Sequence, residues 1–118
     1  MKKLGLTAAA RGAVAANASR PATATLIDTT DLRLIVFRLA PGQSVPLHTS
    51  PSSVLLTVLH GAGSIMGADR EESVAEGEAV FFGPSEPHGM RAKTEEFHLL
   101  ACITPRPGER SRDAVAAS

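Results

Sequence analysis

The sequence contains no tryptophan or tyrosine, only four phenylalanines and one cysteine, and its 12 basic and 12 acidic residues cancel. Without aromatic side chains or excess positive charge, the chain lacks the stacking surfaces and the electrostatic field that bind nucleic acids or anionic membranes. No apolar run is long enough to cross a membrane. A single cysteine forms no internal disulfide, which agrees with a reducing compartment. We therefore expect a cytoplasmic protein that binds neither nucleic acid nor membrane.

The 118 residues suffice for one domain, and three parts are predicted. Residues 1–21 are alanine-rich and without a period, so we expect a flexible N-terminal tail or a docking arm. Arg11 interrupts the apolar stretch there, which argues against a secretory signal. Residues 22–107 are predicted to form the folded barrel. Residues 108–118 are predicted to be a flexible C-terminal tail.

Between these tails, short apolar runs alternate with turn residues, which is typical of a β-sandwich or barrel. Two runs, Leu32–Leu39 and Val54–Leu59, are apolar on both strand faces, so both faces need a cover: the lumen on one side and a second sheet layer, an arm or a neighbouring subunit on the other. These faces and the small core favour a homodimer. The predicted strands are Thr23–Ile27, Leu32–Leu39, Val45–His48, Val54–Leu59, Ser64–Met66, Ser73–Ala75, Ala79–Phe82, His88–Ala92 and Phe97–Thr104.

A spaced pattern of glycine and histidine occupies the middle of the chain. Gly42 is followed by five residues, His48, one residue, Ser50, three residues, Val54, six residues and Gly61.

A second segment, GEAVFFGPSEPH, begins at Gly77 and ends at His88. Together the two segments resemble the two motifs of the cupin family, with the glycines and the outer histidines in register. The resemblance covers residues 32–107 and extends to the PG, VLHG and ITPRPG sequences around the motifs. It implies an all-β fold, a double-stranded β-helix or jelly-roll barrel of two antiparallel sheets.

In cupins, two histidines and a glutamate of the first motif and one histidine of the second converge on a metal inside the barrel. The resemblance carries over only His48 and His88, because Ser50 and Val54 replace the other two ligands. Two imidazoles fall short of the three or four protein ligands of zinc sites and of the 2-His-1-carboxylate set of non-haem iron. The candidate third ligands are His98, Cys102 and Glu86.

The predicted function is that of a small cupin barrel binding a small molecule in an apolar cavity. A divalent transition metal (iron, manganese, nickel or zinc) would be held weakly on the histidine pair or not at all. The alternative is a mononuclear metal-dependent enzyme, an oxygenase, isomerase or lyase, with a third ligand that the sequence does not identify; whether the protein is an enzyme stays open. The residues expected to contact the ligand are His48, Ser50, Val54, Phe82, His88 and Met90.

Each candidate also has a purely structural interpretation. His48 and His88 are explained equally well as core histidines that bind nothing. Cys102 lies in an apolar strand, where a buried, inert thiol is typical. His98 is accounted for as a strand residue with a satisfied ring, and His60, at a strand end beside a turn, as a solvated side chain.

Overall fold

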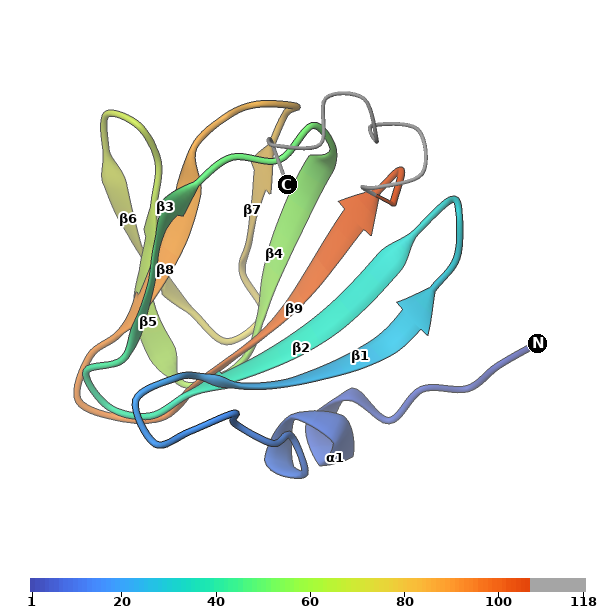
Figure 1. The fold of residues 1–118 in the computed structure, drawn as a ribbon. Coiled ribbons are helices and arrows are strands. Elements are labelled where there is room, and N and C mark those ends of the chain that lie inside the picture. The colour runs from blue at the N-terminus through green and yellow to red at the C-terminus, as the bar shows by residue number, and fades with distance from the viewer. Residues whose placement is uncertain (107–118) are drawn as a thin grey trace.

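The structure is a computed structural model that describes residues 1–106, so the predicted tail 108–118 lies outside the described residues. All nine predicted strands are present in the described part, preceded by one short helix (Figure 1). In chain order the elements are α1 (Leu6–Arg11), β1 (Ala22–Asp28), β2 (Arg33–Leu39), β3 (Ser44–His48), β4 (Ser53–His60), β5 (Ala62–Met66), β6 (Glu71–Ala75), β7 (Ala79–Phe82), β8 (His88–Ala92) and β9 (Phe97–Thr104).

The strands form two sheets, with orders β1-β2-β9-β4-β7 and β3-β8-β5-β6, and every pairing within them is antiparallel. The two sheets face each other across the core (Figure 1). The predicted jelly-roll barrel is therefore confirmed. No helix in residues 1–106 has the length and apolar character needed to cross a bilayer.

The core lies between the sheets and is built from alternate residues of the strands. In β9, Phe97 and Leu99 are fully buried and Ala101 is 2% exposed, and their parity sets the inner face of that strand. The register of β2 with β9 places Leu39 on the same inner face. Hydrophobic burial across this layer supplies the main driving force for the fold.

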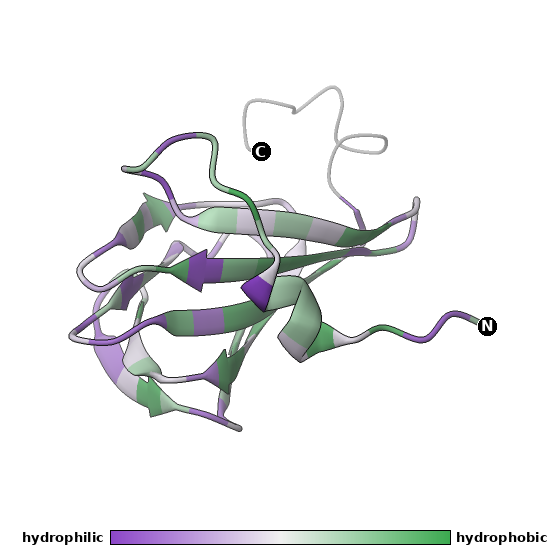
Figure 2. Ribbon diagram, turned by 90° about the horizontal axis from the view of Figure 1, so that it is seen from below, coloured by the Kyte–Doolittle hydropathy of each residue, from purple (hydrophilic) through white to green (hydrophobic). Residues whose placement is uncertain are grey.

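Residues on the outer face of β2 are covered as well. Val36 pairs with Leu100 of β9, on the face opposite the core, yet Val36 has no exposed surface. Helix α1 packs against β1, β2 and β9 and lies across the five-stranded sheet (Figure 2). The cover expected for this doubly apolar strand is therefore the N-terminal segment of the same chain.

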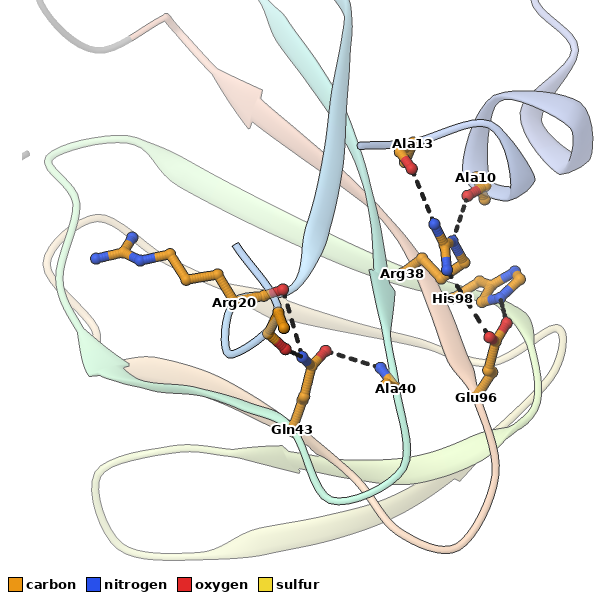
Figure 3. A network of polar contacts seen from close by, with 9 residues as sticks. Ala10, Ala13, Arg20, Arg38, Ala40, Gln43, Glu96 and His98 are labelled. Carbon is orange, nitrogen blue, oxygen red and sulfur yellow. Dashed lines mark hydrogen bonds and ion pairs between the residues drawn. The ribbon is translucent and has the colours of Figure 1, made fainter. Parts of the chain in front are cut away.

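Arg38 of β2 fixes this segment, which we call the N-terminal arm (residues 6–20). Its guanidinium donates to the carbonyl oxygens of Ala10 at 3.1 Å and of Ala13 at 2.8 Å (Figure 3). Gln43 donates through Nε2 to the carbonyls of Ala18 and Arg20, at 3.2 and 3.3 Å. The arm is thus held through its backbone, at two separated points.

One glycine is required by the turn between β4 and β5. Gly61 has φ of +79°, and a Cβ there would stand 2.1 Å from the carbonyl oxygen of Glu96. Only glycine allows both this left-handed backbone and this close approach. The turn therefore seats the end of β4 directly against the loop before β9.

Candidate functional site

The structure brings His48 and His88 together. The two residues are directly paired between the neighbouring strands β3 and β8. Their ring centroids lie 4.3 Å apart, with an interplanar angle of 61°. His88 is 6% exposed, whereas His48 is exposed at the rim. The convergence expected from the two motifs is present in the fold.

A β-bulge in β3 aims the first histidine. Val45 pairs with Met90 and His48 pairs with His88, so three steps along β3 oppose two steps along β8. Simple alternation from Val45 would turn Leu47 inward and His48 outward. The extra residue reverses this, because a bulge shifts which side chains face the sheet interior, and Leu47 is instead 49% exposed.

Both imidazoles are held in one tautomer by the backbone. His48 Nδ1 lies 2.9 Å from the carbonyl oxygen of Pro46, and His88 Nδ1 lies 3.0 Å from that of Glu86. A carbonyl oxygen only accepts, so each Nδ1 carries a proton, and in a neutral ring of this tautomer Nε2 keeps its lone pair. His88 Nε2 has no partner within residues 1–106, and no buried polar side-chain atom there is left unpaired. This nitrogen therefore borders open space.

That space is a cavity of about 170 Å³ between the two sheets. Apart from the two imidazoles its walls are apolar, so a bound molecule would meet hydrocarbon on most sides and two ring nitrogens at one end. The lining residues are Phe37, Val45, His48, Val54, Leu56, His88, Gly89, Met90, Ala101 and Ile103.

The environment keeps His88 neutral. Burial lowers the pKa of His88 below its ordinary value of 6.5; the hydrogen bond to the Glu86 carbonyl raises it, and the neighbouring His48 lowers it again. The net result is a lowered pKa, so the ring stays unprotonated at neutral pH. A neutral ring offers its Nε2 lone pair to a hydrogen-bond donor or to a cation.

This lowered pKa predicts a pH-dependent stability. Between the folded pKa and 6.5, the unfolded chain binds more protons at His88 than the folded chain does, so the free energy of unfolding falls as pH falls through that interval. A His88→Gln variant should lose this component, measured as the difference between urea unfolding curves of the two proteins from pH 8 to pH 5. Curves of the same slope in pH for both proteins would contradict the assignment.

The acidic side chains with lowered pKa values titrate below the pH interval used for His88. Asp28, Glu71 and Glu96 have lowered pKa values, each chiefly because of a side-chain hydrogen bond: to Arg106 for Asp28, to Ser64 for Glu71 and to His98 for Glu96. Their contribution to the free energy of unfolding is complete at pH values above their ordinary pKa values of 3.8 to 4.5 and is lost only in more acidic solution.

Four further residues were predicted to contact a ligand, and the structure places two of them in the cavity wall, one beside it and one in a turn. Val54 and Met90 line the cavity. Phe82 lies beside it, with its ring centroid 5.3 Å from that of His88. Ser50 belongs to a turn instead: its Oγ accepts from the Ser52 amide at 3.1 Å. Ser50 is therefore not a cavity residue.

None of the candidate third metal ligands reaches the pair. His98 and Cys102 lie on the outer face of β9, because Ala101 and Ile103 of the opposite parity line the cavity. Cys102 is partly exposed rather than buried. Glu86 turns its Oε1 to the Gly83 amide, at 2.6 Å.

The donor set in the lumen is therefore incomplete. Within residues 1–106 no three His, Cys, Asp or Glu side chains are grouped to hold a metal ion. The residues that occupy the positions of the missing cupin ligands are a turn serine and an apolar valine. Two imidazoles alone do not fit a protein-held mononuclear centre.

Sequence reasoning missed two features of this region. The first is the part of the cavity wall that β2 and β9 contribute, namely Phe37, Ala101 and Ile103. The sequence shows that these residues have the same parity as Leu39 and Phe97, but only the strand order shows that they meet at the cavity. The second is the cross-strand pair of His60 and His98, whose ring centroids lie 4.8 Å apart. Nothing in the spacing of these two histidines signals that contact.

A family model described as a cupin domain matches residues 35–103, more than half of the chain. The chain belongs to the cupin family. No curated protein matches this cupin at a significant level. The family match spans β2 to β9, and so includes both histidines of the lumen.

Solved structures share the fold over nearly the whole cupin. An RmlC-like cupin protein from Desulfovibrio desulfuricans is 26% identical, with a TM-score of 0.76 over 90% of this chain and 98% of that one. The protein TT1209 from Thermus thermophilus is 24% identical, with a TM-score of 0.80 over 91% and 100%. The polyketide cyclase RemF from Streptomyces resistomycificus is 24% identical, with a TM-score of 0.72 over 91% and 81%. At such identities the likeness speaks for the fold and not for a reaction.

Proposed function

We propose that this cupin binds a small, largely apolar molecule that carries a hydroxyl or another hydrogen-bond donor. The observation that supports this most directly is the shared tautomer of the histidine pair at the end of an apolar cavity. Both Nδ1–H groups are used by backbone carbonyls. Among residues 1–106 no donor reaches either Nε2, and a ligand hydroxyl would supply one.

The size of the cavity limits the ligand. An apolar protein cavity of about 150 Å³ holds a benzene molecule, and the lumen of this cupin has about 170 Å³. The ligand class is therefore a single-ring or short branched molecule. Its apolar body would contact Phe37, Leu56 and Met90, and its polar end would meet the imidazoles.

Phenol and toluene test this proposal as a matched pair, because they share a ring and differ in the hydroxyl. We expect phenol to shift the ¹³C-methyl resonance of Met90 in the wild-type protein and to bind about tenfold more tightly than toluene, the effect of one hydrogen bond of roughly 1.4 kcal/mol. In a His48→Ala/His88→Ala variant the preference for phenol should disappear while toluene still binds.

Ala101→Leu provides the control for the cavity itself. The added methyl groups point into the lumen that Ala101 lines, so both probes should lose binding while the histidines remain. Equal affinity of the wild-type protein for phenol and toluene, or phenol binding that survives Ala101→Leu, would argue against the proposed site.

A metal-dependent enzyme is the second candidate. It is supported by the two Nε2 lone pairs and by the neutral state of His88, and the similar RemF is described as a polyketide cyclase. The described part of the chain supplies two ligands in the lumen, so iron, manganese, nickel or zinc would be held weakly, with the ligand or water completing the set. Elemental analysis decides: stoichiometric metal that is lost in His48→Ala/His88→Ala favours the enzyme.

We also propose that this cupin forms a homodimer in the cytoplasm. Phe81 is 63% exposed and Leu55 is 40% exposed, and these two residues are paired across β4 and β7 on the outer face of the five-stranded sheet. Together they expose an apolar surface of the kind that associating proteins cover. Sedimentation of the wild-type protein should give a dimer mass that Phe81→Glu reduces to that of a monomer.

A further inference from the structure

A second cavity lies outside the barrel lumen, between the N-terminal arm and the ends of β4 and β9. It has a volume of about 290 Å³. Two imidazoles and two carboxylates line it together, and the arm contributes the remaining polar wall. The lining residues are Thr7, Arg11, Leu59, His60, Glu76, Glu96 and His98. We call it the arm cavity.

The four side chains form two histidine–carboxylate couples. His98 Nε2 donates to Glu96 Oε1 at 2.9 Å (Figure 3), and His60 Nδ1 lies 4.0 Å from Glu76 Oε1. The two rings approach to 4.8 Å between centroids, tilted by 43°. Each carboxylate thus stands next to an imidazole nitrogen, and the imidazoles stand next to each other.

A bulge in β4 creates this arrangement. Val58 pairs with Leu99 and His60 pairs with His98, so Leu59 is the extra residue. Without it, His60 would share the inward face of Val58. The bulge turns His60 to the outer face, beside His98.

We propose that the arm cavity binds one divalent transition-metal ion of the zinc type, with His60 and His98 as nitrogen ligands and the Glu76 and Glu96 carboxylates as oxygen ligands. Imidazole and carboxylate together suit zinc and its neighbours in the first row. This site is independent of the lumen and of the function proposed for it.

Binding at this site requires side-chain rotation, because within residues 1–106 no three such groups converge on one point. Two of the four can rotate freely: the His60 side chain is 56% exposed and that of Glu76 is 69% exposed. The other couple is anchored, since His98 is only 4% exposed and holds Glu96. A metal ion would take the place of the Nε2 proton of His98, which would move to Nδ1 of the same ring, and would draw in the mobile couple.

Two cations border the arm cavity. Arg38 Nη1 lies 3.8 Å from Glu96 Oε2 while the same guanidinium holds the arm. Arg11 lines the cavity without an ion pair of its own in the described residues. The two carboxylates, Glu76 and Glu96, balance the charges of Arg11 and Arg38. Arg11 opposes a bound cation, so its removal should strengthen the binding of Zn²⁺.

The test uses Zn²⁺ titrations in competition with a chromophoric chelator at pH 7.5, in a His48→Ala/His88→Ala background that removes the lumen pair. We expect one Zn²⁺ per chain. His60→Gln should weaken binding at least tenfold, Glu76→Gln should weaken it severalfold, and Arg11→Ala should strengthen it. Glu95→Gln, a neighbour of Glu96 that does not line the cavity, is the matched control and should change nothing.

The substituted His60 and Glu76 are both largely exposed, so these variants should fold. Absence of Zn²⁺ binding in the background protein, or binding that His60→Gln leaves unchanged, overturns the proposal. Weaker binding after Arg11→Ala overturns it as well, because removal of a positive charge beside a Zn²⁺ ion in the arm cavity has to strengthen its binding. When His60→Gln is introduced alone, with His48 and His88 retained, phenol binding in the lumen should stay intact, so failure of the arm cavity and failure of the lumen are separately visible.

Discussion

Phe97→Ala is expected to lower the free energy of unfolding by about 3–5 kcal/mol, the usual cost of truncating a fully buried phenylalanine. Phe97 has no exposed surface and belongs to the core between the sheets. Its ring also lies 2.7 Å from where a Cβ on Gly63 would stand, so β5 and β9 pack closely at this point. Domains of this size have a total stability of about 5–15 kcal/mol, so the loss should appear as a large drop in the urea midpoint.

Phe81→Ala is the matched control, because it removes the same atoms from a side chain that is 63% exposed. At a protein concentration where the chain is monomeric, its effect should stay within about 0.5 kcal/mol. Similar losses for the two variants, or a loss below about 1 kcal/mol for Phe97→Ala, would mean that the core is not the one described.

Arg38→Ala is expected to release the part of the N-terminal arm around helix α1, because Gln43 holds the arm only at Ala18 and Arg20. The guanidinium is bonded to the Ala10 and Ala13 carbonyls, and hydrogen bonds to a charged group contribute about 1.5–3 kcal/mol each. Helix α1 has only six residues, too few to persist without packing. Amide hydrogen exchange in the arm, measured by mass spectrometry, should therefore accelerate at least tenfold while exchange in the barrel strands stays unchanged.

Arg33→Ala is the control for this variant, since Arg33 lies on the same strand and pairs with Asp28 rather than with the arm. It should leave exchange in the arm unaffected. An equal acceleration in both variants would show that loss of any arginine from β2 loosens the arm, and the contacts of Arg38 would then not be what holds it.

Most of the barrel could be predicted from the sequence because its signals are local. Glycine and proline turns divide the chain into short apolar runs, and each run became a strand. The positive-φ glycines Gly42, Gly61 and Gly77 stand at motif positions. Helix α1 gave no such signal, because six residues are too few to establish a helical period.

The site was only partly predictable because bulges change the face of a strand. His48 faces the lumen through a bulge in β3, and His60 leaves it through a bulge in β4. An extra residue of this kind depends on pairing with a neighbouring strand and leaves no mark in the alternation of the chain itself. The spacing of the motifs was enough for His48, whereas His60 and His98 belong to no shared motif.

The histidine pair can be tested most directly by long-range ¹H–¹⁵N NMR of the imidazole rings at pH 7.5, with and without phenol. The structure predicts that His48 and His88 are both protonated on Nδ1, and that phenol shifts their two Nε2 resonances and leaves those of His60 and His98 in place. Protonation of either ring on Nε2, or a phenol response confined to His60 and His98, would contradict a ligand site in the barrel lumen.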